Sequence, residues 1–488
     1  MGKKNKKRND IKITPFHIDN EVTGSSILVE VDGLKIVLDL GLYQTQVRNL
    51  ETIYKINNEK LALPLKEIDY VIFTSSHADH CSAGGFLGRS DIGFKGEAIS
   101  TSLSQELIKL NVLDSAYLMK SECDNYNKKH NKDLKPLYSQ TDAETFLSFL
   151  KGYGYYEKVY LNDRVYFQYL SNGHLSGDGS IYLTYEKNEY EKVRLLYTGD
   201  HNFGKKRKKP FTKVWDENVK VKPDVVITES TYGGETQILD KNPIDKLEEY
   251  IISEVVEKKH TFFIPCFAIH RSSELAYMLK VIWDRNEKIR NAGIPIYFAG
   301  VMMTRAHRII GNPKYKEFYD EEWKNQDDLF EWDKIKFIDN FKTVQNKMVS
   351  QSPKIIVASG GMITSYSKYL LSCYVTQKNC SILFLGYQGL GTLGRKTLEH
   401  EHKTITIDGK PHIIRANILG KLEGLSGHAD DKGLRGIFKV LDLHKLKKII
   451  IIHGDNDRKQ KLKEELELDL NKKNIEVVVP KPRHSIKV

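Results

Sequence analysis

The chain has 488 residues, of which 40% are hydrophobic, so it is long enough for two domains and apolar enough to fill their cores. Its five cysteines are scattered and form no CxxC pair, which excludes a disulfide framework and favours a reducing compartment. Because no apolar run approaches about 18 residues and no signal peptide is visible, the sequence predicts a soluble, cytoplasmic protein with no membrane segment.

The charge of the chain points to a polyanionic partner. The net charge is +11, and clustered Lys and Arg bind phosphates by releasing counterions. Residues 1–10 are expected to form a basic tail. The basic run KKRKKP begins five residues after Asp200, so Lys205, Lys206 and Arg207 are candidate contacts to a nucleic-acid backbone, although a solvated surface is the alternative interpretation.

Five apolar runs rich in β-branched residues each end in an acid or a histidine. In layered α/β proteins, functional groups gather at the carboxyl ends of buried strands. One acid after a strand is usually a turn former, but five such endings predict a common site. The runs are KIVLDLG at Asp39, IDYVIFTSSHADH at His77, VRLLYTGD at Asp200, PDVVITES at Glu229 and KKIIIIHGD at His453.

The middle of the chain has its own alternation of strands and helices. Amphipathic helices are expected at residues 242–259 and 272–283, and strands at 261–268, 294–300 and 354–361. After this region, the pattern of strands followed by candidate ligands resumes with LSGHADD and IIIIHGDND. The sequence therefore predicts an α/β protein in which a domain of residues 234–395 is inserted between two parts of another, 11–233 and 396–488.

His77, Asp79 and His80 stand at positions i, i+2 and i+3 directly after a predicted strand. On a loop, this spacing lets the three side chains point toward one small volume, and imidazole with carboxylate suits zinc. His174, Asp200 and His453 are the more distant candidates that would complete a metal site.

These residues resemble the motifs of the metallo-β-lactamase superfamily, and more narrowly its β-CASP branch of nucleases, which includes the ribonuclease subunit of the eukaryotic cleavage and polyadenylation factor, its archaeal and bacterial relatives and RNase J. Further matching segments are residues 101–108, 137–144, 264–275, 357–364 and 385–395. The resemblance implies an αββα sandwich with an inserted α/β β-CASP domain. The motif residues are Asp39, Ser75, His77, Asp79, His80, His174 and Asp200, then Glu229, His428 and His453.

The resemblance also implies roles for these residues. One zinc would be held by His77, His174 and Asp200, and a second by Asp79, His80, Asp200 and His453, with Mn²⁺ as an alternative ion. A metal-bound hydroxide would attack a phosphodiester in line. His428 would act as the general acid, Glu229 would orient it, and Asp39 would orient the ligands.

Ser75 departs from the pattern, because family members carry a zinc-binding histidine at this place. Three interpretations stay open. In one, the first zinc site binds metal with a water in place of the missing histidine; in another, the protein uses the second zinc alone for catalysis; in the third, it is inactive and binds RNA without cutting it. Retention of the other six metal-binding motif residues, His77, Asp79, His80, His174, Asp200 and His453, favours activity. Asp178, in GHLSGDGS, is an additional acid near His174 that either lies in a loop without function or compensates as a metal ligand.

Single-stranded RNA is the expected substrate, since RNA-processing members resemble this chain in having a histidine at the position of His453. Ser359, Gly360 and Gly361 offer backbone N–H groups that suit a phosphate, or form an ordinary tight turn. A DNA 5′-exonuclease and an inactive RNA-binding or assembly subunit are the alternatives. Cleavage within or from the end of a strand, a homodimer and protein partners all stay open.

Overall fold

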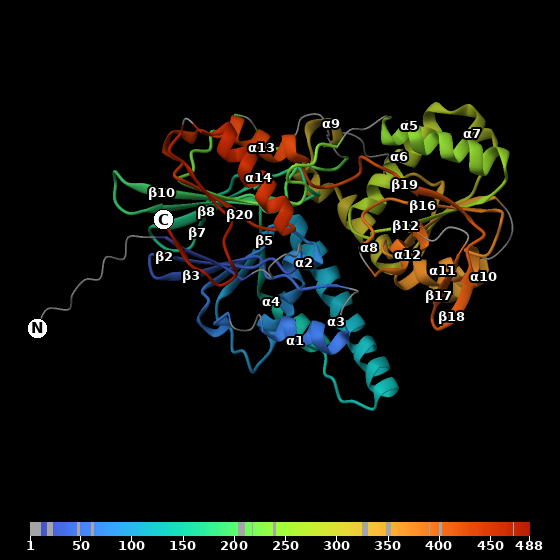
Figure 1. Ribbon diagram of the computed structural model, residues 1–488, viewed down its shortest axis with the longest axis horizontal. Coiled ribbons are helices and arrows are strands. Elements are labelled where there is room, and N and C mark those ends of the chain that lie inside the picture. Colours follow the sequence, from blue (N-terminus) through green and yellow to red (C-terminus); the bar gives the residue numbers. More distant parts are fainter. Residues whose placement is uncertain are drawn as a thin grey trace, which may run out of the picture.

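Two seven-stranded sheets face each other in one half of the molecule (Figure 1). The computed structural model describes residues 11–16, 23–45, 49–59, 63–203, 210–216, 218–237, 241–324, 330–347, 353–389, 391–399, 403–471 and 473–488. In order across the first sheet, the strands are β22 (Ile486–Lys487), β1 (Lys12–Pro15), β2 (Ile27–Val31), β3 (Leu34–Leu38), β4 (Tyr70–Ile72), β5 (Glu97–Thr101) and β6 (Leu150–Tyr153).

The second sheet contains strands from three distant parts of the chain. Its order is β21 (Glu476–Val478), β20 (Lys448–Ile451), β11 (Val225–Thr228), β10 (Lys192–Tyr197), β9 (Gly179–Glu186), β8 (Val165–Ser171) and β7 (Val159–Tyr160). A cluster of buried side chains from both sheets, including Ile36, Ile72, Phe167 and Ile227, fills the space between them. This central layer explains why these strands read as nearly continuous apolar runs.

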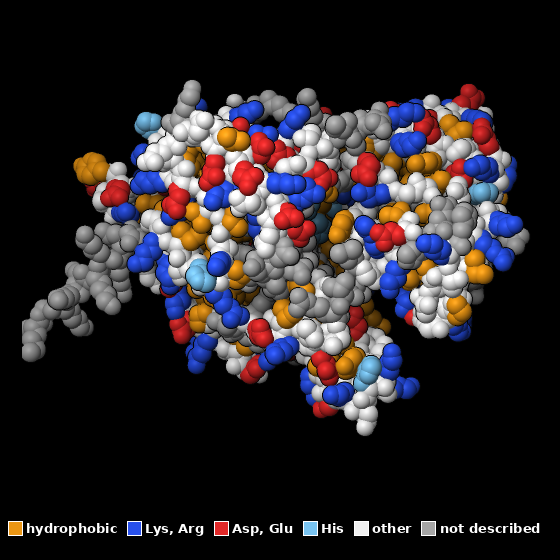
Figure 2. Space-filling model, in the orientation of Figure 1, with side chains coloured by type: hydrophobic (Ala, Val, Ile, Leu, Met, Phe, Trp, Pro, Cys, Tyr) orange, Lys and Arg blue, Asp and Glu red, His pale blue; other side chains and the backbone are white. Residues whose placement is uncertain are grey.

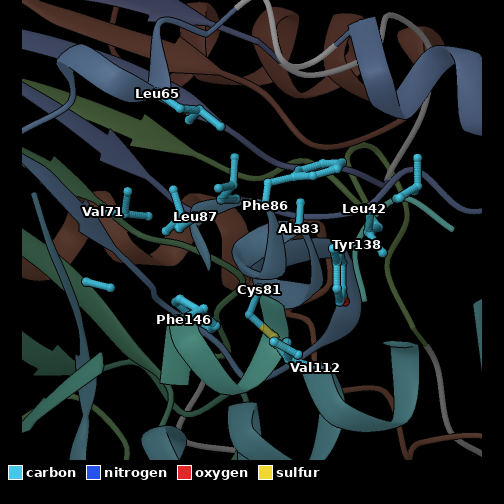
Figure 3. Close-up of a cluster of buried hydrophobic side chains, with 14 of the residues drawn as sticks. Leu42, Leu65, Val71, Cys81, Ala83, Phe86, Leu87, Val112, Tyr138 and Phe146 are labelled. Atoms are coloured by element: carbon cyan, nitrogen blue, oxygen red, sulfur yellow. The ribbon is translucent and has the colours of Figure 1, made fainter. Parts of the chain in front are cut away.

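Helices cover the outer face of each sheet. The second sheet is covered by α13 (Asp431–Val440) and α14 (Asn456–Asp469). The first is covered by α1 (Leu50–Glu59), the long α3 (Ser102–His130) and α4 (Gln140–Phe149), together with the short α2 (Ala78–Cys81) and turns η2 (Leu65–Glu67) and η3 (Ser82–Gly88). Figure 3 shows the apolar cluster beneath them, which includes Leu42, Leu65, Val71, Cys81, Ala83, Phe86, Leu87, Val112, Tyr138 and Phe146. The four layers form the expected αββα sandwich.

A six-stranded parallel sheet forms the other half of the molecule (Figure 1). Its order is β14 (Ile335–Ile338), β13 (Ile296–Ala299), β15 (Lys354–Ser359), β12 (Thr261–Cys266), β16 (Cys380–Phe384) and β19 (Asn417–Lys421). The helices of this half are α5 (Pro243–Tyr250), which continues as the π-helical η5 (Ile251–Glu257), α6 (Arg271–Arg285), α7 (Glu287–Asn291), α8 (Val301–Ile310), η6 (Pro313–Phe318), α9 (Glu321–Lys324), α10 (Phe341–Lys347), α11 (Ser365–Tyr374) and α12 (Leu393–Glu399).

The inserted unit extends beyond residue 395, where the sequence places its end. Helix α12 continues across that position, and β19 adds an edge strand to the six-stranded sheet by pairing with β16. Between them, β17 (Thr404–Ile407) and β18 (Lys410–Ile413) form a hairpin whose Ile405 and Ile407 are buried in the same core. The chain therefore returns to the sandwich only after residue 421. The short strand β19 (NILGK) is mixed in polarity, so its sequence gives no sign of this pairing.

An apolar cluster joins the two halves. It contains Leu103 and Leu107 from α3, Ile269 directly after β12, and Ala306 and Ile310 from α8. Since α8 follows β13, and β12, β13 and β15 are parallel, the carboxyl edge of the six-stranded sheet faces the sandwich. Among the described residues, no helix combines the length and the apolar character that crossing a bilayer requires.

Candidate metal centre

The predicted site residues lie together at one edge of the sandwich. All five predicted strands are confirmed, and the acid or histidine follows each strand end by one to five residues. Because β3 and β4 are parallel, and β8, β10, β11 and β20 share a direction in the facing sheet, their carboxyl ends meet. The side chains at this edge are Asp39, His77, Asp79, His80, His174, Asp200, Glu229 and His453, and His428 joins them from the segment between β19 and α13.

Three groups of three residues have the spacing of metal ligands. One of them, Asp200 with Glu229 and His428, contains the pair described below, and the other two contain the ligands expected from the sequence. One ligand atom each from His77, His174 and Asp200 lies within 4.8 Å of the others, and the same holds for Asp79, His80 and His453. Asp200 connects the groups: its Oδ2 lies 3.0 Å from His80 Nε2 and its Oδ1 lies 3.4 Å from His453 Nδ1. The arrangement thus brings all six residues named from the sequence as ligands to one centre.

Asp39 hydrogen bonds to His80 Nδ1, the ring nitrogen that faces away from Asp200. Its carboxylate is fully buried and accepts hydrogen bonds from the Thr74 amide at 2.7 Å, the Tyr197 hydroxyl at 2.7 Å and His80 Nδ1 at 2.8 Å. With Nδ1 bonded to a carboxylate, the Nε2 atom of His80 is left to face Asp200 and the centre. Asp39 itself has φ of 57°, a left-handed conformation that aspartate tolerates better than most residues.

Asp178 occupies the corresponding place behind His174. His174 Nδ1 lies 2.7 Å from Asp178 Oδ2, while its Nε2 lies 3.9 Å from Asp200 Oδ2. Burial raises the pKa of Asp178 to about 8, although a hydrogen bond from Ser75 opposes the shift. Ser75 is buried, and its Oγ accepts a hydrogen bond from the His77 amide at 3.1 Å.

His428 and Glu229 form a pair beside the metal-ligand groups. Glu229 Oε2 lies 2.9 Å from His428 Nδ1, and His428 Nε2 lies 3.9 Å from Asp200 Oδ2. Burial lowers the pKa of His428, but the carboxylates of Glu229 and Asp200 raise it more, to about 9. The His428 side chain is 21% exposed, whereas Glu229 is buried, so the histidine is the member of the pair that a substrate can reach.

The charges of the centre fit a divalent cation. Within the described part of the chain, the carboxylates of Asp39, Asp79, Asp178, Asp200 and Glu229 have ion pairs with histidines and with no lysine or arginine. The buried Oδ1 of Asp200 has no hydrogen-bond partner among the described residues. Buried carboxylates are usually paired or coordinate metals, and imidazole with carboxylate is a donor set for zinc and related ions.

The expected substrate contacts lie elsewhere. Ser359, Gly360 and Gly361 end β15, at the edge of the six-stranded sheet that faces the sandwich, and belong to neither metal-ligand group. Gly360 has φ of 104°, and a Cβ on Gly361 would lie 2.7 Å from the Phe267 ring, so both positions require glycine. Lys205, Lys206 and Arg207, and the basic tail of residues 1–10, fall outside the described residues.

Several residues that support the centre were not predicted. Asn172 Nδ2 donates to the Asp200 carbonyl at 2.8 Å, and the His201 amide donates to Glu229 at 2.8 Å. Thr231 Oγ1 lies 3.2 Å from His453 Nδ1. Asn172 precedes His174 by two residues and His201 follows Asp200 directly, so their closeness in the sequence to motif residues could have identified them. Tyr197 had none, because its hydroxyl reaches Asp39 across the sandwich.

Three family models match separate parts of the chain. The metallo-beta-lactamase superfamily matches residues 19–90, the Beta-Casp domain matches 272–397, and the Zn-dependent metallo-hydrolase RNA specificity domain matches 412–480. A crystal structure of a protein of unknown function from Enterococcus faecalis V583 has the same fold, with a TM-score of 0.54 at 10% sequence identity. The alignment covers 98% of this chain and all of that one.

Relatives match nearly the whole chain at low identity. Integrator complex subunit 11 of Danio rerio is 25% identical over 95% of this chain and 72% of its own length. Cleavage and polyadenylation specificity factor 73 of Drosophila melanogaster is 24% identical over 93% and 61%, and transcription termination factor FttA of Methanocaldococcus jannaschii is 27% identical over 90% and 66%. This chain therefore spans about two thirds of each relative. With the αββα sandwich, the inserted sheet and the converging motifs, these matches show that the chain belongs to the β-CASP branch of the metallo-β-lactamase superfamily.

Proposed function

We propose that this protein is a zinc-dependent ribonuclease that hydrolyses phosphodiester bonds of single-stranded RNA. The observation that carries the proposal is the convergence of two three-residue groups on Asp200, with the His428–Glu229 pair beside them. The match to an RNA specificity domain, and relatives named for cleavage and polyadenylation and for transcription termination, support RNA as the substrate.

His77, His174 and Asp200 would hold one zinc, and Asp79, His80 and His453 would hold a second that shares Asp200. Bound zinc lowers the pKa of a coordinated water to about 7 and stabilises negative charge on a phosphate. Mn²⁺ accepts the same nitrogen and oxygen donors, so it is the alternative ion. Asp39 keeps the Nε2 atom of His80 turned toward the centre, and Asp178 does the same for His174.

His428 is suited to give a proton to the leaving oxygen. Its Nδ1 is bonded to the buried Glu229, which fixes the ring, and its Nε2 faces Asp200 and the partly exposed mouth of the centre. The Glu229 carboxylate, which raises the pKa of the ring and is not among the proposed metal ligands, favours the protonated form that a general acid requires. The expected products carry a 5′-phosphate and a 3′-hydroxyl.

An RNA strand at the centre would also meet the six-stranded sheet. The backbone N–H groups of Gly360 and Gly361, with the Ser359 hydroxyl, lie on the edge that faces the sandwich and suit a neighbouring phosphate. Figure 2 shows Lys and Arg interspersed with Asp and Glu over the visible face, so this face offers no single basic patch. Ser359, Gly360 and Gly361, together with the basic run from Lys205 to Arg207, would then hold the RNA strand.

Ser75 favours a second candidate, an inactive RNA-binding or assembly subunit of the same fold. To decide, 5′-labelled RNA and DNA of equal sequence and length are incubated with the zinc-loaded protein and with its Asp200→Ala variant. We expect RNA to be cut faster than DNA, and the variant to be inactive. Binding of RNA without cutting, at any zinc or manganese concentration, would support the inactive subunit, and preferred cutting of DNA from its 5′ end would support an exonuclease.

A further inference from the structure

The two histidines that face Asp200 from opposite sheets are held in the same way. His80 places Nε2 toward Asp200 and bonds through Nδ1 to Asp39, and His174 places Nε2 toward Asp200 and bonds through Nδ1 to Asp178. Both supporting carboxylates have 0% of their surface exposed. A carboxylate behind an imidazole fixes the proton on Nδ1, leaves the lone pair on Nε2, and makes that nitrogen a stronger ligand.

Asp178 also contacts the place where the chain has lost a ligand. The amide of Ser76, the residue that follows Ser75, lies 3.4 Å from Asp178 Oδ1, and the Ser75 hydroxyl lowers the pKa of Asp178 against the larger opposite effect of burial. Asp178 therefore connects the motif loop of the first sheet to His174 of the second.

The two positions share one buried volume. Ser75 is 1% exposed and Asp178 is 0% exposed, and the Ser76 amide next to Ser75 lies 3.4 Å from Asp178 Oδ1. An imidazole at position 75 is larger than a hydroxymethyl group, and tightly packed interiors resist added volume. A histidine at position 75 would therefore have to displace the Asp178 carboxylate, so the residues at these two positions depend on each other.

We propose that Asp178 is a positioning residue that compensates for Ser75: by holding His174, it lets His77, His174 and Asp200 bind a divalent metal without a histidine at position 75. This inference rests on the proposed metal-dependent function and concerns the first of its two sites. It treats Ser75 and Asp178 as a coupled pair, so that the effect of a substitution at one position on metal affinity depends on the residue at the other.

The test is a zinc titration of the full-length, chelator-treated protein in competition with a chromogenic chelator of known affinity. The chains compared are the natural protein, Asp178→Ala, Ser75→His and the double variant. Asp224→Ala is the matched control, because Asp224 is a buried acid of the same sheet that accepts a hydrogen bond from the Arg194 amide at 2.9 Å and belongs to neither metal group.

We expect two zinc ions in the natural protein. Asp178→Ala should weaken one of them by about 10- to 100-fold, the usual effect of removing a carboxylate behind a ligating histidine, while the other ion stays bound and reports that the fold is intact. Ser75→His alone should not strengthen the first site, whereas the double variant should return to within about threefold of the natural affinity by this coupling. Co²⁺ in place of zinc should give visible absorption that changes in Asp178→Ala and not in Asp224→Ala.

Equal zinc affinities in the natural protein and Asp178→Ala would overturn the inference, as would a natural protein that binds one ion only at the group of Asp79, His80 and His453. Additive effects of the two substitutions would also overturn it. The proposed function is refuted by a different result, namely a natural protein that cuts no RNA at any zinc or manganese concentration. An active protein with unaltered metal binding in Asp178→Ala refutes only the role of Asp178.

Discussion

Asp39→Ala is predicted to weaken both the sandwich and the metal centre. The carboxylate accepts hydrogen bonds from Thr74, Tyr197 and His80, and all three donors are buried. A hydrogen bond to a charged group contributes about 1.5–3 kcal/mol, and removing the acceptor leaves buried donors without a partner. Since such contributions are not additive, we expect a loss of about 3–5 kcal/mol in the free energy of unfolding of the metal-free protein.

The same substitution should lower zinc affinity by about 10- to 100-fold at the group that contains His80, because the ring loses the bond that fixes its Nδ1 proton. Urea unfolding and competitive zinc titration measure the two effects. Asp69→Ala is the control: Asp69 lies at the opposite end of the same strands and accepts one hydrogen bond, from the Lys35 amide at 2.8 Å. Asp69→Ala should lower the free energy of unfolding by about 1 kcal/mol and leave zinc affinity unchanged. If the two variants behave alike in both measurements, the assigned role of Asp39 is wrong.

Three further outcomes are expected. His428→Ala should slow RNA cleavage by about 10²- to 10⁴-fold with unchanged zinc content, as measured by single-turnover kinetics and metal analysis; loss of zinc instead would make it a ligand rather than an acid. Glu254 has a pKa of about 2, because hydrogen bonds from Lys258, Ser381 and Asn417 outweigh the opposing effect of burial. Its charge therefore stabilises the fold above about pH 4.5, and this stabilisation is lost as the pH falls toward 2. In urea unfolding, Glu254→Gln should lower the free energy of unfolding by about 1–3 kcal/mol at pH 7 and leave it unchanged near pH 2. An equal loss at both pH values would contradict this. Alanine at Lys205, Lys206 and Arg207 together should reduce the slope of log binding constant against log salt by up to about three for RNA; an unchanged slope would place these residues away from the strand.

The sequence predicts the strand ends well because each one combines two independent signals. A β-branched apolar run indicates a buried strand, and the residue that follows it is confined to the edge where the carboxyl ends of such strands meet. Asp39, Asp200, Glu229 and His453 could all be placed in this way. His428 follows no long apolar run, and its position depended on the family resemblance alone.

What the sequence could not predict are contacts that cross between elements without a local pattern. Tyr197 lies inside an apolar strand, and nothing in its neighbours shows that its hydroxyl reaches Asp39 in the other sheet. The edge strand β19 is only five residues long and mixed in polarity, so the inserted unit was expected to end too early. Asp178 was noticed as an extra acid, but its bonds to His174 and Ser75 join residues about 100 positions apart, at 75 and 174.

The construction of the centre explains why a ligand can be lost without loss of the fold. The proposed ligands follow four strand ends, those of β4, β8, β10 and β20, and each strand is held by hydrogen bonds of its own sheet and by the apolar layer between the sheets. Ser75 accepts a hydrogen bond from the His77 amide, so the motif loop has a local support at this position. A substitution there removes one donor atom from the centre but leaves the frame that positions His77, His174 and Asp200. The chemistry at such a centre can therefore change by single residues while the scaffold persists, and the proposed compensation by Asp178 depends on this property.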